Sequence, residues 1–215
     1  MRHLFLRLLF IVGATAIAPV FADDLNDMVK SAQLDSPGTL KRMLAQGHSP
    51  NLVDPASGEP LLLVAAREGA DRVADVLLAH KDIQLEQRAT NGNTALMMAA
   101  FKSNKALVIK LLARGAIVTY PGWTPLHYAA AGGSTEIVSI LLEHHAYIDA
   151  ESPSKLTPLM VAAREGQEAV VLQLLAAGAD AKLKNNENLT AIQIALRADK
   201  PRIAAAIGRH LGTVP

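Results

Sequence analysis

Hydrophobic and polar positions recur along this chain with a period of about 33 residues. A pair of small apolar residues marks each period, and a pair of larger apolar residues begins twelve residues later. The clear copies are Ala65-Ala66 with Leu77-Leu78, Ala99-Ala100 with Leu111-Leu112, Ala129-Ala130 with Leu141-Leu142, and Ala162-Ala163 with Leu174-Leu175. Degenerate copies begin at Ser31 and Ala195. The pattern therefore predicts six similar units along the chain.

Each period predicts two short helices and a turn. A threonine stands five residues before the small position in four units, where its hydroxyl can cap the first helix. These threonines are Thr94, Thr124, Thr157 and Thr190. Glycines can end the first helix at Gly69, Gly133 and Gly166, and the second helix at Gly47, Gly115 and Gly178. The second helix carries an apolar stripe that one unit cannot bury alone, so we expect neighbouring units to stack.

The segment Gly122-Trp123-Thr124-Pro125-Leu126-His127-Tyr128-Ala129-Ala130 resembles an ankyrin repeat, and residues 156–180 are a second clear copy. The resemblance covers about residues 25–210. It implies an all-α ankyrin-repeat solenoid of about six helix-turn-helix units with degenerate terminal caps. The family's histidine remains at His127, where the resemblance implies a hydrogen bond to neighbouring backbone. Other residues replace it in four units, namely Leu63, Met97, Met160 and Gln193.

The first residues have the pattern of an export signal. Arg2 and Arg7 supply positive charge, and residues 8–18 form an apolar run of about 11 residues, whereas a bilayer span needs about 20. Small residues at Val20 and Ala22 suit a signal peptidase, so we expect cleavage after Ala22. The alternative is an uncleaved membrane anchor or a buried N-terminal helix.

These observations divide the chain into four segments. Residues 1–22 are the expected signal peptide, and residues 23–57 are a degenerate N-terminal ankyrin cap. Four central repeats occupy residues 58–184. Residues 185–215 form a C-terminal capping repeat and tail.

Composition narrows the functional classes. The chain has 215 residues, of which 50% are hydrophobic and 4% aromatic, so we expect a closely packed helical core of alanine and leucine. A formal net charge of +1 argues against a histone-like nucleic-acid binder. The absence of cysteine excludes a disulfide scaffold, a thiol nucleophile and a cysteine-ligated metal. The sequence also carries neither a Gly-rich phosphate loop nor a nucleophile elbow. We therefore expect no enzymatic activity and no cofactor.

Adjacent histidines at His144 and His145 do not suggest a metal site. Neighbouring side chains on a helix diverge by about 100°, whereas a two-histidine site needs a spacing of three or four residues. We expect these residues at an exposed helix end, where cations interact favourably with the helix dipole. No metal ligand is predicted.

The residue after each small pair is expected to face a concave surface, which the family resemblance implies. These positions form a row of Gln33, Arg67, Phe101, Ala131, Arg164 and Arg197. Arginines therefore flank an apolar centre, which suits a protein interface. The alternative is a set of solvated arginines, with Arg67 and Arg164 paired to the adjacent Glu68 and Glu165.

The turn between the third and fourth units is three residues shorter than the norm. Residues 116–121 should therefore form a short finger that leaves a notch, with Tyr120 and Trp123 beside it. Leu156 takes the position of Trp123 in the next unit. These three side chains are candidate binding residues together with Arg67, Phe101, Arg164 and Arg197. The alternatives are a neutral deletion in a turn and a Trp123 ring that folds onto Pro121 and Tyr120.

Together these features predict a non-enzymatic protein–protein interaction module of the bacterial periplasm. It is expected to be a monomer that binds a protein on its concave face, with no nucleic acid and no membrane insertion after signal cleavage. An exported chain without cysteine suits the periplasm better than the endoplasmic reticulum. The alternative is an accessory protein of periplasmic peroxide defence, which would support a catalase or a similar enzyme. A hydrolase or metal-binding protein is a third, weaker interpretation.

The export signal generates a direct prediction. When the full chain is expressed in a bacterium and recovered from the periplasm, its intact mass should lack residues 1–22 and begin at Asp23. A full-length mass in the membrane fraction would contradict both the cleavage and the compartment.

Overall fold

The computed structural model describes residues 18–212. Residues 1–17 of the expected signal peptide lie outside this part, and the predicted cleavage point after Ala22 falls within the first described helix. Among residues 18–212, no helix combines the length and the apolar character that a membrane span requires. Cleavage and compartment remain predictions.

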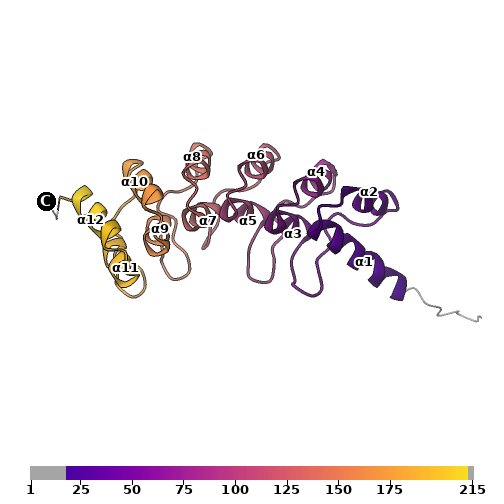
Figure 1. Ribbon diagram of the computed structural model, residues 1–215, viewed down its shortest axis with the longest axis horizontal. Coiled ribbons are helices and arrows are strands. Elements are labelled where there is room, and N and C mark those ends of the chain that lie inside the picture. The colour runs from indigo at the N-terminus through magenta and orange to yellow at the C-terminus, as the bar shows by residue number, and fades with distance from the viewer. Residues whose placement is uncertain (1–17, 213–215) are drawn as a thin grey trace, which may run out of the picture.

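The described residues form twelve α-helices arranged as six consecutive pairs, which confirms the predicted all-α ankyrin-repeat solenoid. The pairs are α1 (Ala18–Gln33) and α2 (Pro37–Ala45), α3 (Leu61–Glu68) and α4 (Asp71–Ala79), α5 (Ala95–Phe101) and α6 (Lys105–Ala113), α7 (Pro125–Gly132) and α8 (Thr135–Glu143), α9 (Pro158–Glu165) and α10 (Glu168–Ala176), and α11 (Ala191–Arg197) and α12 (Pro201–His210). Figure 1 shows α3, α5, α7, α9 and α11 side by side in one layer, here called the inner helices. Helices α4, α6, α8 and α10 form the second layer, here called the outer helices.

The predicted helix ends are present in the structure. Thr94 and Thr157 each accept a hydrogen bond from a backbone N–H three residues later, at 3.3 Å. Gly133 and Gly166 end α7 and α9 in the left-handed conformation, with φ of 79° and 84°. Glycine is favoured at these positions because a side chain at such a φ is strained.

The alanine pairs allow the inner helices to approach one another closely. All eight alanines of the four clear pairs are fully buried, as are the leading leucines Leu77, Leu111, Leu141 and Leu174 of the outer helices. The approach is tightest at Gly132, where a Cβ atom would lie 2.4 Å from the carbonyl oxygen of Phe101. A residue without a side chain is therefore needed at position 132, where α7 meets the backbone of α5.

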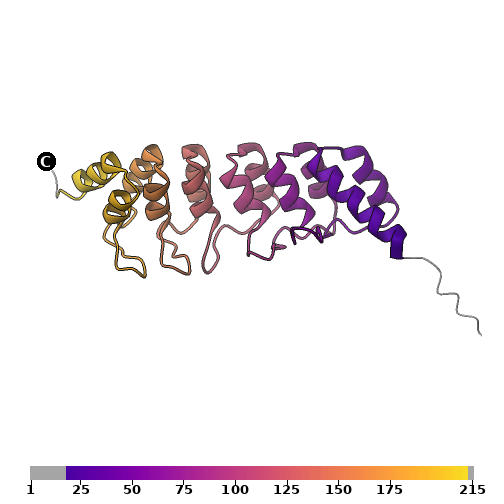
Figure 2. The same ribbon diagram turned by 60° about the horizontal axis from the view of Figure 1, so that its bottom comes forward.

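Five connections, here called fingers, run from one unit to the next inner helix. They comprise residues 46–60, 80–94, 114–124, 144–157 and 177–190. The third is the shortest, and Figure 1 shows that it projects less than its neighbours. Figure 2 shows the fingers along one side of the helical stack. Hydrogen bonds join adjacent fingers, for example from Asp180 N to Asp149 Oδ1 at 3.0 Å.

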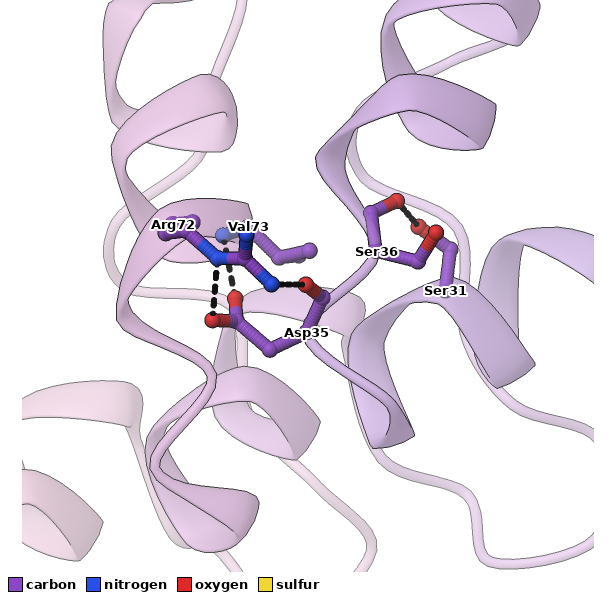
Figure 3. A network of polar contacts seen from close by, with 5 residues as sticks. All are labelled: Ser31, Asp35, Ser36, Arg72 and Val73. Atoms are coloured by element: carbon purple, nitrogen blue, oxygen red, sulfur yellow. Dashed lines mark hydrogen bonds and ion pairs between the residues drawn. The ribbon is translucent and has the colours of Figure 1, made fainter.

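A polar contact between units supports the start of α4. Residue Ala70 at the N-cap of α4 has no acceptor in its side chain, and Asp35 of the preceding unit takes over this role (Figure 3). Its carboxylate accepts from Val73 N at 2.9 Å and from Arg72 Nε at 2.8 Å, while Arg72 Nη2 donates to the Asp35 carbonyl oxygen at 2.6 Å. The N-terminal cap is thus joined to the first central repeat by charge-assisted hydrogen bonds.

The Asp35 carboxyl responds to pH in a defined direction. Burial by itself would raise its pKa, but the hydrogen bonds from Arg72 and Val73 outweigh burial and lower the pKa below the ordinary value of 3.8. The carboxylate therefore stabilises the fold fully above about pH 3.8. This contribution is lost as the pH falls through the lowered pKa.

Asp35→Asn should therefore lower the free energy of unfolding by about 1 kcal/mol at neutral pH, because the amide keeps an acceptor and loses the charge. The difference from the wild type should shrink once the pH falls below 3.8, as measured by urea denaturation. Asp75→Asn is the control, because Asp75 forms an exposed ion pair with Lys110 and should change stability by less than about 0.5 kcal/mol. Equal losses in both variants would contradict a capping role for Asp35.

Candidate interaction groove

Two hollows lie where the inner helices meet the fingers, and together they are here called the groove. The first hollow, the aromatic hollow, has a volume of about 320 Å³. It is lined by Phe101, Trp123, His127, Tyr128, Ala131, Val161, Arg164 and Glu165. The structure therefore brings together Phe101, Trp123 and Arg164, which are three of the candidate residues. The partly buried Ala131 of the same row lines the same hollow.

The aromatic rings of this hollow support one another. Phe101 and Trp123 both pack edge-on against Tyr128, with ring centroids 6.5 and 6.1 Å apart. The Trp123 ring also packs edge-on against His127 at 5.2 Å. Such edge-to-face pairs stabilise a fixed arrangement of rings. Phe101 nevertheless keeps 46% of its surface exposed, so the hollow presents an apolar side chain to solvent.

Tyr128 was not among the predicted binding residues, yet it links the rings to the preceding unit. Its hydroxyl donates to Asn93 Oδ1 in the second finger. Burial raises the pKa of this phenol, so it remains a protonated donor. A signal was available, because Tyr128 stands three residues before Ala131 and residues at that spacing share a face of a helix.

Tyr120 lies apart from Trp123, against the second finger. The guanidinium carbon of Arg88 lies 4.2 Å from the centre of the Tyr120 ring, a cation–π contact. The described ring contacts of Trp123 are with His127 and Tyr128. Trp123 and Tyr120 thus have different described ring partners, and the alternative in which Trp123 folds onto Pro121 and Tyr120 stays a prediction.

The second hollow, the C-terminal hollow, has a volume of about 520 Å³ and lies between α9, α11 and the last two fingers. It is lined by Ser154, Leu156, Arg164, Asn185, Asn186, Glu187, Leu189, Ile194, Arg197 and Ala198. Three candidate residues, Leu156, Arg164 and Arg197, meet here. Arg164 lines both hollows, which therefore adjoin one another.

The three arginines of the predicted row differ in their partners. Arg67 is held between Glu59 and Glu68, at 3.0 and 3.1 Å, and lies outside both hollows. Arg164 pairs with Glu165 at 2.9 Å, and Arg197 pairs with Glu187. The adjacent glutamates that the sequence analysis weighed for Arg67 and Arg164 are thus in contact with them.

His127 lines the aromatic hollow and contacts the backbone of Leu156, which lines the C-terminal hollow. Its Nδ1 accepts from Thr124 N at 3.2 Å, which leaves Nε2 as the protonated nitrogen that donates to the Leu156 carbonyl oxygen at 2.8 Å. The backbone hydrogen bond implied by the family resemblance is therefore present. Burial lowers the pKa of His127 to about 4, so the imidazole is neutral near neutral pH. Both ring nitrogens are occupied, which leaves neither free for a metal or a substrate.

The other histidines considered in the sequence analysis lie at the end of α8. His144 Nδ1 lies 2.9 Å from the carbonyl oxygen of Ile140, and His145 has a left-handed backbone with φ of 63°. Within residues 18–212, no group of three His, Cys, Asp or Glu side chains is arranged to hold a metal ion.

Comparisons with known proteins agree with the repeat architecture. A family model for ankyrin repeats (three copies) matches residues 28–121 and 117–185. "SH3 and multiple ankyrin repeat domains protein 2" of Homo sapiens is 34% identical over 161 residues, covering 72% of this chain and 9% of that protein. "Transient receptor potential cation channel subfamily A member 1" of Homo sapiens is 32% identical over 72% of this chain and 14% of that protein. "B-cell lymphoma 3 protein homolog" of Mus musculus is 30% identical over 74% of this chain and 37% of that protein. The matches span only a small part of each relative.

The buried neutral His127 generates a prediction about stability. The unfolded imidazole takes up a proton near pH 6.5, whereas the folded one does so only near pH 4. Wild-type stability should therefore fall by roughly 2 kcal/mol from this residue as the pH drops from about 7 to about 5.

The matched variant is His127→Met, because Met97 and Met160 occupy the corresponding positions of neighbouring units. It should be less stable than the wild type at pH 7 and should lose the His127 part of the pH dependence. Urea denaturation at the two pH values measures both quantities. Identical pH dependence in the two proteins would show that His127 is not held neutral by the fold.

Proposed function

Since this chain belongs to the ankyrin-repeat family, we propose that it is a non-enzymatic protein–protein interaction module that binds a protein partner in the groove. Ankyrin repeats indicate a protein-interaction module. We propose in addition that its binding site is the groove and that the protein has no catalytic activity. The carrying observation is the aromatic hollow, in which Phe101 is exposed while its neighbours hold it in place. Interfaces take most of their binding energy from a few such residues, among which Trp, Tyr and Arg are enriched.

The state of His127 supports a non-catalytic groove. It is the histidine that lines the aromatic hollow, and its two ring nitrogens already have partners. Its pKa of about 4 leaves it a weak base near neutral pH, where a general base needs a higher value. These properties of His127 favour a binding role for the groove over proton transfer.

We propose the bacterial periplasm as the compartment. Support comes from the sequence of residues 1–22, in which a basic start, a short apolar run and small residues precede Asp23. The absence of cysteine suits an exported protein of this kind better than one of the endoplasmic reticulum. The partner in this proposal is therefore another periplasmic protein.

Substituting two residues of nearly equal exposure, one on each layer of helices, tests whether the partner binds in the groove. Phe101 on the inner helix α5 is 46% exposed, and Ile109 on the outer helix α6 of the same unit is 47% exposed. After a periplasmic partner has been captured by crosslinking to the full chain and purified, Phe101→Ala should weaken its binding by about 2 kcal/mol, or about 30-fold.

Ile109→Ala should leave the affinity unchanged, because it alters the far layer. Calorimetric titration gives both affinities, and thermal melting should show similar stability for the two variants. An Ile109→Ala variant that loses as much affinity as Phe101→Ala would place the partner elsewhere on the molecule.

A further inference from the structure

The two ends of the inner-helix row are not equivalent in charge. Arg67, at the N-terminal end, contacts two carboxylates, and the side chain of one of them, Glu59, is only 14% exposed. The guanidinium is thus already neutralised within the fold. Its pairing leaves little capacity for an anionic group on a partner.

The C-terminal end has guanidinium groups with open donors. Arg164 is 44% exposed and Arg197 is 67% exposed, and each is paired with a single glutamate that is itself largely exposed. A guanidinium has five N–H donors, so one carboxylate leaves several of them available. Exposed ion pairs of this kind contribute little to stability and can rearrange when a partner approaches.

A third cation lies near this end. A Cβ atom at Gly166 would lie 3.0 Å from Cε of Lys200, so the lysine side chain passes over the residue that follows Glu165. Lys200 is thus a further cation beside the two arginines and their glutamate partners. Apolar side chains of Leu156, Leu189 and Ile194 line the same hollow as the two guanidinium groups, together with polar side chains.

The two hollows have the dimensions of side-chain pockets. Their volumes of about 520 and 320 Å³ lie in the range of sites that enclose several apolar groups. Arg164 forms part of the wall of both, so the two hollows adjoin at this side chain. A chain-terminal carboxylate at Arg164 would leave one hollow empty.

We infer that the groove binds an extended internal segment of its partner that carries an acidic side chain between two apolar ones. The Asp or Glu carboxylate of that segment lies between Arg164 and Arg197 and accepts hydrogen bonds from their free donors. One apolar side chain fills the C-terminal hollow, and an aromatic or aliphatic side chain packs against Phe101 and Trp123. This inference rests on the proposed function and specifies the chemistry of the partner.

The test uses a library of random twelve-residue peptides displayed on phage and selected against the full chain. Selected sequences should share an Asp or Glu flanked by large apolar residues. Arg197→Gln should weaken the binding of a selected synthetic peptide by at least about 10-fold. The matched control is Arg202→Gln, because Arg202 is an exposed arginine on α12 outside both hollows and should leave the affinity unchanged.

Charge exchange provides a second measurement. Arg197→Glu should bind the selected peptide poorly and should recover affinity when the acidic residue of the peptide is replaced by lysine. Amidating the C-terminus of the peptide should have no effect, because an internal side chain supplies the carboxylate. A loss of binding on amidation would instead identify a chain-terminal carboxylate and would overturn the proposed internal segment.

Three results would contradict the inference, namely no selected peptides, selected peptides without a carboxylate, and equal losses for Arg197→Gln and Arg202→Gln. The captured partner separates this failure from failure of the proposed function. If Phe101→Ala weakens the partner and Arg197→Gln does not, the groove binds a protein whose chemistry differs from this inference. If neither change affects the partner, both the proposed function and the inference fail.

Discussion

Every unit of this protein depends on its neighbours to bury its apolar residues. The alanine pairs on the inner helices are fully buried because the adjacent inner helix lies directly against them, and the leucines of the outer helices are buried in the same stack. A unit removed from the stack would expose both surfaces to water, at a cost that scales with the apolar area. Stability therefore resides in contacts between units, and the shape of the molecule follows from their repetition.

The inner helices also carry the candidate site. Gly132 of α7 meets the backbone of Phe101 on α5, while the Phe101 side chain remains partly exposed. Tyr128 of the next unit packs against the Phe101 ring, and Trp123 packs against Tyr128. The same pair of helices therefore supplies both a tight packing contact and side chains of the candidate site.

Polar side chains that reach across units complete the structure. Asp35 caps a helix of the following unit, and His127 donates to the backbone of the following finger. Both contacts place a titratable group where its charge state affects stability, in opposite senses. Asp35 stabilises the fold when charged, whereas His127 stabilises it when neutral. They join the units by specific hydrogen bonds in addition to apolar burial.

Much of this organisation could be predicted from the sequence, because repetition is visible in one dimension. The period, the threonine caps, the terminal glycines and the short third finger all depend on local residue types, and the structure has each of them. The row after the alanine pairs was also predictable, since it follows from helix periodicity.

What only the tertiary structure decided is which members of that row meet. Arg67 and Arg164 look alike in the sequence, yet Glu59 holds the first while the second lies between two hollows. Tyr120 and Trp123 are close in sequence, but Tyr120 packs against Arg88 of the second finger and Trp123 packs against Tyr128 of its own unit. The partner of each ring depends on the spacing of fingers and helices in three dimensions.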